Sequence, residues 1–146
     1  MPVKLLRSGD ELQVGPRSAT KLEVLHPPRG GVFGSDNANS IVLLIEHADR
    51  RVLLTGDLEA RGLSDMMADP AIDCDVLMAP HHGSPRSNPQ GLAGWCRPEH
   101  VVISGARDYE LGRDHEAVAR AFKEKFSRGE FEARSRRFSR RPIGKS

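Results

Sequence analysis

Two apolar runs of strand type end abruptly in polar residues of the kinds that do chemistry. Residues 75–80 (Asp-Val-Leu-Met-Ala-Pro) lead into His81-His82-Gly83-Ser84, and residues 52–54 (Val-Leu-Leu) lead into Thr55-Gly56-Asp57. In layered α/β proteins, functional sites occur where buried strands end, because the loops that follow carry polar side chains on a rigid scaffold. Asp57, His81 and His82 are therefore the first candidates for catalytic or metal-binding groups.

Metal binding is one use for these groups. Zinc takes imidazole nitrogen and carboxylate oxygen, with four protein ligands in structural sites and three plus water in catalytic ones. Neighbouring residues of an extended backbone point to opposite faces, so we expect only one of His81 and His82 to bind a given ion. A capped strand end followed by a turn remains the commoner explanation of such spacing, and both explanations stay open at this point.

The loop after the two histidines also contains the kinds of groups that form an anion-binding site. It carries the hydroxyls of Ser84 and Ser87, the guanidinium of Arg86 and backbone N–H groups beside Gly83. A helix is predicted to begin at Asn88, and its N-terminal dipole favours negative charge. The alternative is that Ser87 or Asn88 simply caps that helix. The two explanations are compatible, because a capped helix start can still bind an anion.

The elements that must position these residues follow from hydrophobic periodicity. Alternating residues near the start predict strands at a sheet edge, and the continuous apolar run 41–46 predicts a central strand buried on both faces and joined to the next strand by a hairpin. Strands are predicted at 3–6, 11–14, 21–25, 41–46, 51–54, 75–80, 100–104 and 131–134, and helices at 58–68, 88–95 and 114–126. This order predicts one α/β layered domain with helices on the sheet.

Composition narrows the class of protein. The chain has 146 residues, a net charge of +2 and 29% charged residues. It contains no apolar run of the ~20 residues that a membrane helix needs, and its start lacks a hydrophobic signal core, so we expect a soluble chain without a membrane span of its own. Cys74 and Cys96 lie outside any CxxC pattern and are predicted to be buried free thiols, with a disulfide as the alternative.

Positive charge is concentrated near the end of the chain. From residue 121 onward nine Lys and Arg residues face only three Glu residues. A basic tail of this kind can attract phosphate backbones, and a solvated terminus without a ligand is the alternative.

Three motifs together resemble one known family. Residues 39–43 (Asn-Ser-Ile-Val-Leu), 53–57 (Leu-Leu-Thr-Gly-Asp) and 76–84 (Val-Leu-Met-Ala-Pro-His-His-Gly-Ser) stand in the order and near the spacing seen in the metallo-β-lactamase-fold domain of ComEC-type DNA-uptake competence proteins. Residues 24–28 and 103–105 resemble that family too. The resemblance runs from about residue 5 to residue 126, most of the chain.

This resemblance implies a fold, a metal centre and a reaction. The family fold is an αββα sandwich that holds two metal ions, usually zinc or manganese, at one edge of its sheets. Asp57 would be the bridging carboxylate and His81 a histidine ligand, with His82 beside them. Asn39, Ser84 and Ser87 would lie near the substrate phosphate. The implied reaction is phosphodiester hydrolysis, in which the metals lower the pKa of a bound water and clamp the attacking and leaving oxygens.

The sequence departs from the family pattern in two places. The leading signature His-x-His-x-Asp-His, which supplies most of the metal ligands, is absent: none of the six histidines form a pair at i, i+2. The chain therefore resembles only the C-terminal half to two-thirds of the fold. Relatives also carry Gly-His-Pro-His before the last helix, where this chain has Gly112-Arg113-Asp114-His115. Arg113 thus stands in place of a site histidine and is a candidate phosphate-binding residue. His115 is either a third metal ligand or a neutral surface residue.

Our sequence hypothesis is a metallo-β-lactamase-like domain that is incomplete at its N-terminal side. Residues 1–128 would form its C-terminal portion, and residues 129–146 an edge strand and a basic tail. The parent protein would be a metal-dependent hydrolase of nucleic acid in DNA uptake, while this chain alone would be inactive because two ligands hold a metal weakly.

The expected partners are nucleic acid and either the missing half of the domain or a second copy of the chain, without membrane contact by this chain itself. The alternative is a non-catalytic module that binds nucleic acid or another anion, in which Arg113 replaces the metal charge. A purely structural remnant is a third alternative, and the sequence leaves the cellular compartment open.

Overall fold

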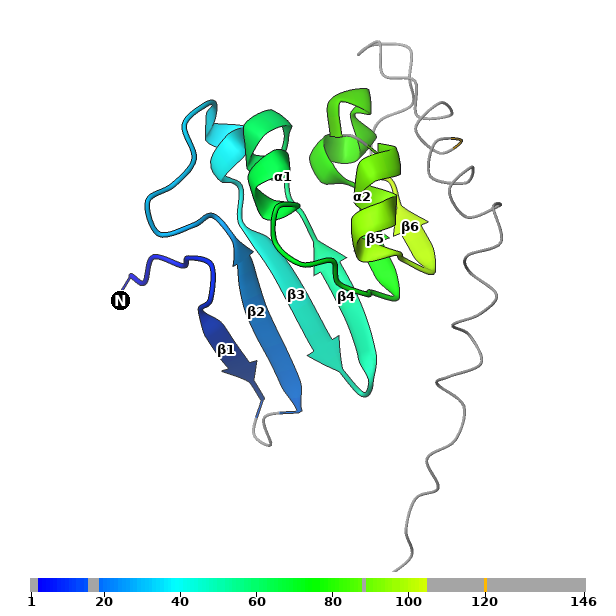
Figure 1. Ribbon diagram of the computed structural model, residues 1–146. Coiled ribbons are helices and arrows are strands. Elements are labelled where there is room, and N and C mark those ends of the chain that lie inside the picture. The colour runs from blue at the N-terminus through cyan, green and yellow to red at the C-terminus, as the bar shows by residue number, and fades with distance from the viewer. Residues whose placement is uncertain (1–2, 16–18, 88, 105–119, 121–146) are drawn as a thin grey trace, which may run out of the picture.

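The computed structural model describes residues 3–15, 19–87, 89–104 and 120. These residues form a mixed sheet of six strands in the order β1-β2-β3-β4-β5-β6 (Figure 1). The strands are β1 (Glu11–Val14), β2 (Thr20–His26), β3 (Val42–His47), β4 (Arg50–Leu54), β5 (Val76–Met78) and β6 (His100–Val102). The predicted α/β class is confirmed at this level.

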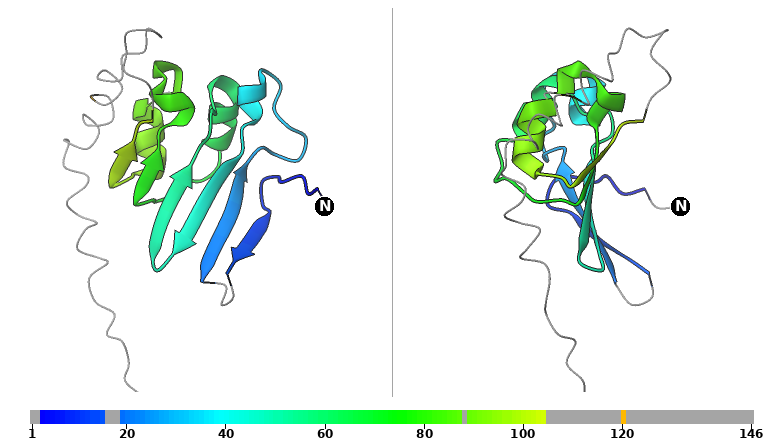
Figure 2. Two further views of the ribbon diagram at one scale, coloured as in Figure 1. Left: turned by 180° about the vertical axis from the view of Figure 1, so that it is seen from behind. Right: turned by 90° about the vertical axis from the view of Figure 1, so that its right-hand side faces the viewer.

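Pairing changes from antiparallel to parallel halfway across the sheet. Strands β1 to β4 pair antiparallel, whereas β5 pairs parallel with β4, and β6 pairs parallel with β5. Two helices make the crossovers between the parallel strands, α1 (Ala60–Met66) and α2 (Pro89–Cys96), and both lie on the same face of the sheet (Figure 2). As a result, the carboxyl ends of β4, β5 and β6 meet at one edge.

The hairpin between β3 and β4 shows how directly the sequence determines this part of the fold. Only Ala48 and Asp49 separate the two strands, and both have positive φ, 47° and 62°. A two-residue loop with positive φ at both positions matches the right-handed twist of the strands it joins. The predicted hairpin is confirmed, and it returns the chain as β4, which ends at Leu54 just before the turn that carries Asp57.

The core lies between the sheet and the two helices. Its members are buried residues from alternate positions on β3, β4 and β5, from α1 and α2, and from the segments that connect these elements: Val42, Leu44, Leu53, Leu58, Leu63, Met66, Cys74, Leu77, Ala79, Leu92, Ala93, Trp95 and Cys96. Alternate side chains of a strand point to opposite faces, so these positions define the covered face of the sheet.

The other face of the sheet is also apolar, but no helix of the described residues covers it (Figure 2). The strand register places one side chain from each of five strands in a row across this face: Leu12, Leu22, Ile45, Val52 and Val76. All five are only partly buried, and none belongs to the core. The prediction that the central strand is buried on both faces is therefore wrong for this part of the chain.

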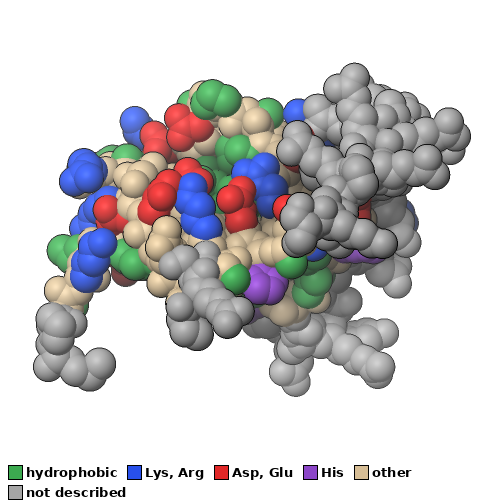
Figure 3. Space-filling model, turned by 90° about the horizontal axis from the view of Figure 1, so that it is seen from below, with side chains coloured by type: hydrophobic (Ala, Val, Ile, Leu, Met, Phe, Trp, Pro, Cys, Tyr) green, Lys and Arg blue, Asp and Glu red, His purple; other side chains and the backbone are tan. Residues whose placement is uncertain are grey.

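The end of the sheet that carries the hairpin tip has balanced charge. Lys21 pairs with Glu11 at 2.8 Å, and Arg51 pairs with Glu46 at 2.9 Å. Acidic and basic side chains consequently interleave over this end of the molecule, as Figure 3 shows from below. This surface therefore has no excess positive charge that would attract an anionic ligand. The strand ends that carry the candidate site residues lie at the opposite end of the sheet.

Several predicted elements differ from the structure. The strand predicted at 3–6 is wrong, because these residues pair with no strand of the described sheet, and Val3 and Leu5 are 89% and 72% exposed. The strand predicted at 100–104 exists as β6, but at the edge of the described sheet its residues His100 and Val102 are exposed rather than buried.

The helices agree better with their predictions. The helix predicted at 58–68 is shortened to Ala60–Met66, because the backbone is still extended at Glu59, with φ −148° and ψ 170°. The helix predicted at 88–95 is confirmed as Pro89–Cys96, with proline at its first position. The predicted helix at 114–126, the strand at 131–134 and the basic tail lie outside the described residues. Within the described ranges, no helix has the length and apolarity needed to cross a membrane.

Candidate functional site

The polar residues singled out in the sequence gather at the carboxyl edge of β4, β5 and β6. Asp57 and Glu59 follow β4, the two histidines follow β5, and Ser104 follows β6. Thr55 holds two of these strand ends together, because its buried hydroxyl donates a hydrogen bond of 2.6 Å to the carbonyl of Met78. Parallel pairing thus brings side chains together that are up to 47 residues apart in sequence.

The two histidines lie in a left-handed turn. His81 has φ 47° and ψ 50°, His82 has φ 55° and ψ 31°, and Gly83 continues with φ 76°. A left-handed conformation costs roughly 1–2 kcal/mol for a residue with a side chain, and such strain concentrates at functional sites. The expectation of an extended backbone at this pair is therefore wrong. The two rings still diverge, with centroids 6.4 Å apart and planes inclined at 67°.

Neighbouring groups hold this strained turn in place. The backbone N–H of His81 donates to the carbonyl of Gly56 at 3.0 Å, and that of Ser84 donates back to the carbonyl of His81 at 3.0 Å. Gly83 is required here, since a Cβ at this position would lie 2.6 Å from Cγ2 of Ile103. The turn is therefore fixed by β4 on one side and by the chain after β6 on the other.

His82 lies between two oxygen groups from neighbouring strand ends. Its Nδ1 is 3.0 Å from the carbonyl oxygen of Ser104, which accepts the hydrogen bond, and its Nε2 is 3.4 Å from Oδ1 of Asp57. The side chains of His82 and Asp57 are about half exposed, 46% and 49%. The structure thus brings two predicted site residues, Asp57 and His82, into contact at an accessible position.

His81 pairs with a residue that the sequence analysis did not select. Its Nδ1 lies 2.8 Å from Oε2 of Glu59, and the two side chains are only 22% and 16% exposed. The other carboxylate oxygen of Glu59 accepts a hydrogen bond of 3.4 Å from Nδ2 of Asn37. The one available signal was the position of Glu59, two residues after Asp57 and at the start of the predicted helix 58–68.

These side chains match a zinc or manganese site in kind but not in number. Carboxylate oxygen and imidazole nitrogen are ligands that both metals accept. Yet in the described part of the chain no three His, Cys, Asp or Glu side chains lie close enough together to hold one ion. Asp57 contacts His82 whereas His81 contacts Glu59, so the predicted ligands Asp57 and His81 have different partners. The predicted third ligand, His115, and Arg113 lie outside the described residues.

The predicted phosphate-contacting residues have structural roles in their loops. Ser87 is fully buried, and its hydroxyl donates a hydrogen bond of 2.6 Å to the carbonyl of Ser84. The hydroxyl of Ser84 accepts a hydrogen bond of 3.3 Å from the backbone of Arg86. The side-chain amide of Asn39 makes two hydrogen bonds to the backbone of Val32, at 2.7 and 2.8 Å, and so closes the loop before β3. Phosphate contact by these residues stays a prediction.

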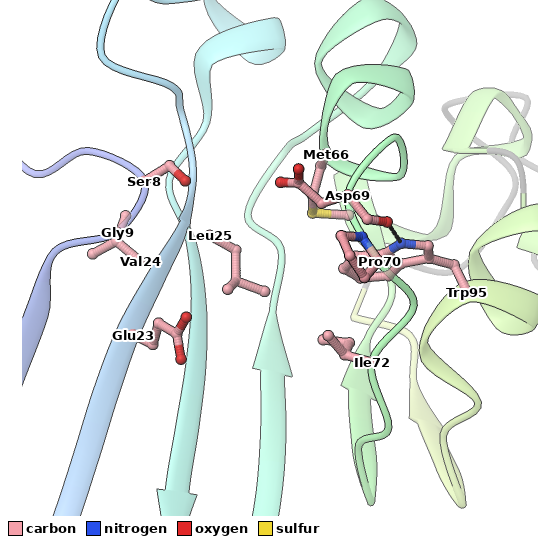
Figure 4. A pocket seen from close by; sticks show the side chains of 10 residues that line it. All are labelled: Ser8, Gly9, Glu23, Val24, Leu25, Met66, Asp69, Pro70, Ile72 and Trp95. Atoms are coloured by element: carbon pink, nitrogen blue, oxygen red, sulfur yellow. Dashed lines mark hydrogen bonds between the residues drawn. The ribbon is translucent and has the colours of Figure 1, made fainter.

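A pocket of about 230 Å³ lies away from this site, between β2 and the helix side of the core (Figure 4). Trp95 closes it from α2 and donates a hydrogen bond of 2.9 Å from Nε1 to the carbonyl of Asp69. Its lining contains none of the histidines and neither Asp57 nor Glu59. The candidate site is therefore the open carboxyl edge of the sheet rather than this pocket.

Comparison with known proteins gives two relatives, while no family model matches the chain. The chain is 38% identical over 80 residues to Recombination protein 2 of Haemophilus influenzae, a match that covers 55% of this chain and 10% of that protein. It is 31% identical over 117 residues to ComE operon protein 3 of Bacillus subtilis, covering 80% of this chain and 15% of that protein. The chain thus spans only about a tenth to a seventh of the length of these curated relatives.

Proposed function

We propose that this chain is part of a DNA-uptake protein and contributes one half of a site that hydrolyses phosphodiesters. The similarity to Recombination protein 2 and ComE operon protein 3 supports the link to DNA uptake. The ordered strand-end motifs, with their resemblance to the metallo-β-lactamase domain of ComEC-type proteins, support the hydrolytic site. The observation that carries the proposal is the pair of carboxylate–imidazole contacts, Asp57 with His82 and Glu59 with His81.

The chemistry of these residues suits phosphodiester hydrolysis. Histidine can take or give a proton near neutral pH, and a carboxylate beside it orients the ring. His82 is the more accessible of the two rings and is held between Asp57 and Ser104, so it would handle the proton of the attacking water or the leaving oxygen. Metal ions, when bound, would supply an activated water and charge stabilisation. Asp57 and His81 would be the ligands from this chain, and the rest would come from residues beyond those described.

The uncovered apolar face supports an αββα sandwich in the complete protein. The row Leu12, Leu22, Ile45, Val52 and Val76 is the pattern of an inner sheet face, and such faces pack against a second sheet about 10 Å away. One covered face and one uncovered apolar face are what a single αβ half of that sandwich would show. In this proposal the second sheet comes from the longer polypeptide, and its strand-end loops bring the missing ligands to the same edge.

Metal content and hydrolysis in the longer protein test this proposal. The polypeptide that contains this chain is purified as wild type, Asp57→Ala and His81→Ala, with His47→Ala as a matched control. His47 is exposed at the hairpin end and contacts Thr20, far from the site. We expect near-stoichiometric zinc or manganese and DNA hydrolysis in the wild type and the control, and loss of both in the two site variants. Metal and hydrolysis that survive in both site variants would contradict the proposal.

A second candidate function is anion or nucleic-acid binding without metal. It is favoured by the shortfall of metal ligands in the described residues and by exposed Arg86 in the turn between the histidines and α2. This module would bind single- or double-stranded DNA in the presence of a chelator, with an affinity that falls steeply with salt concentration. Chelator-resistant binding without any hydrolysis would favour this function over the first.

A further inference from the structure

We infer that Glu59 is a positioning residue that fixes the tautomer of His81, so that the ring presents the lone pair of Nε2 to whatever binds at the strand-end site. The contact between Nδ1 of His81 and Oε2 of Glu59 is 2.8 Å long and largely shielded from solvent. An ionised carboxylate only accepts hydrogen bonds, so Nδ1 must carry the proton. In the neutral ring Nε2 is then the acceptor, and among the described residues it has no hydrogen-bond partner.

The side chain of Glu59 is free for this task because it does not cap its own helix. Glu59 occupies the N-cap position of α1, with φ −148° and ψ 170°, yet its side chain makes no capping hydrogen bond. A carboxylate at this position ordinarily accepts hydrogen bonds from the first turn of the helix or complements its dipole. Here both oxygens are directed elsewhere, one to His81 and the other to Asn37.

The backbone on both sides of the contact is arranged to make it. Ala60, directly after Glu59, has φ 49°, and His81 itself has φ 47°. Two strained residues flank one hydrogen bond, and strain of this kind persists only where the surroundings over-determine it. Asn37 adds a third attachment, because it connects Glu59 to the 3₁₀ turn Asp36–Asn39 before β3. The carboxylate is therefore held against movement toward or away from the ring.

This inference rests on the proposed function only for the identity of the group that binds Nε2, which would be a metal ion. A carboxylate that accepts the far N–H of a ligating histidine sets its orientation and raises its basicity, and loss of such a partner costs about 10- to 100-fold in metal affinity. The tautomer itself is a property of this chain without any ligand. The two claims can therefore fail separately.

Imidazole ¹⁵N–¹H correlation spectra test the tautomer directly. Spectra are recorded without metal at a pH well above the ordinary histidine pKa of about 6.5, with His81→Gln used to assign the signals. We expect His81 to carry its proton on Nδ1 in the wild type. Glu59→Ala should move it toward the Nε2–H form that a free imidazole side chain favours, whereas Glu59→Gln, whose carbonyl still accepts, should restore the Nδ1–H form. A wild-type His81 protonated on Nε2 would overturn the inference without recourse to any variant.

Two control variants separate positioning from a general effect on the fold. Glu11→Ala removes an exposed glutamate that pairs with Lys21 on the edge strand and should leave the His81 signals unchanged. Asn37→Ala loosens Glu59 but keeps its acceptor, so the tautomer should also survive. A folded Glu59→Ala protein with unchanged His81 signals would overturn the inference.

Metal affinity of the longer protein is the second readout, with an expected loss of about 10- to 100-fold in Glu59→Ala. If His81 has the expected tautomers but neither the wild type nor Glu59→Ala binds metal, the proposed function fails and the positioning role of Glu59 stands. If Glu59→Ala loses affinity but keeps the Nδ1–H tautomer, the positioning role fails and the metal site stands.

Discussion

Replacing Gly62 by alanine should destabilise the domain, although alanine is the better helix former. Gly62 lies in α1, where a Cβ would come within 2.2 Å of the carbonyl oxygen of Ala38 and 2.8 Å of Cδ1 of Leu58. Both neighbours are buried, and real Cβ atoms essentially never come closer than 3.0 Å to another residue's atoms. The helix and the 3₁₀ turn before β3 must therefore move apart.

The size of the effect follows from two opposing terms. Overpacking in a filled core costs about 1–3 kcal/mol, and a contact with a fixed backbone oxygen belongs at the upper end of that range. Alanine returns about 1 kcal/mol relative to glycine inside a helix. The net loss should be about 2 kcal/mol, equivalent to a fall of roughly 8 °C in Tm for a domain of this size.

Urea and thermal unfolding of the purified chain measure this loss. Gly30→Ala is the matched control, because a Cβ there meets no heavy atom within 4 Å and should change the free energy of unfolding by less than about 0.5 kcal/mol. The variant should also weaken the contact between Asn37 and Glu59, which connects the same two segments. A Gly62→Ala protein as stable as the wild type would refute the close approach of α1 to residue 38.

Two further predictions concern ionisable groups of the core and the sheet. The side-chain contact with Cys74, followed by burial, raises the pKa of the Cys96 thiol. A thiol reagent at pH 8 should therefore label Cys96 rapidly only after denaturation, and rapid labelling of the folded chain would contradict this. For Asp75, burial is the largest influence and acts to raise the pKa, but the backbone N–H of Arg51 and the side chain of Arg50 together hold it below its usual range. The stability from this lowered pKa is present above the unfolded value of about 3.9 and is lost as pH falls through the folded value. Asp75→Asn should therefore lose about 1–2 kcal/mol at pH 7 and progressively less as the pH falls below about 3.9, as measured by urea unfolding, and an equal loss across this range would count against the pairing.

The sequence was most informative where local rules and the sheet agree. The short connection predicted at residues 47–50 allowed little but a hairpin, which the structure closes with Ala48 and Asp49 alone. The Pro89 start of α2 followed from the fixed φ of proline. The strand predicted at residues 3–6 failed because apolar residues alone do not say whether a partner strand exists, and no strand of the described sheet pairs with this segment. The sequence likewise did not show that the central strand is only partly buried, since a continuous apolar run does not say whether both of its faces are covered within this chain.

For the site, spacing predicted the right strand ends but not the right partners. Asp57, His81 and His82 do gather at one edge, as parallel strands require. The choice of partner depended on the left-handed conformation of His81 and His82, which nothing in their residue types announces. Glu59 was overlooked because an acidic residue at a helix start is ordinarily explained by the helix dipole. Only the absence of a capping hydrogen bond distinguishes it, and that is a property of the folded chain.

The described chain has too few metal ligands at its strand-end site and no cover on one face of its sheet, and in our proposal one further layer supplies both. The strand-end site gathers carboxylates and imidazoles in pairs and not in the groups of three that a metal ion needs, while the opposite sheet face presents a row of five apolar side chains without cover. A second sheet packed on that face would end in loops at the same edge, because packed sheets keep their strand directions within about 30° of one another. The layer that removes apolar surface from water would thereby also deliver polar residues to Asp57 and His81. In our proposal, completion of the fold and completion of the site are therefore one event.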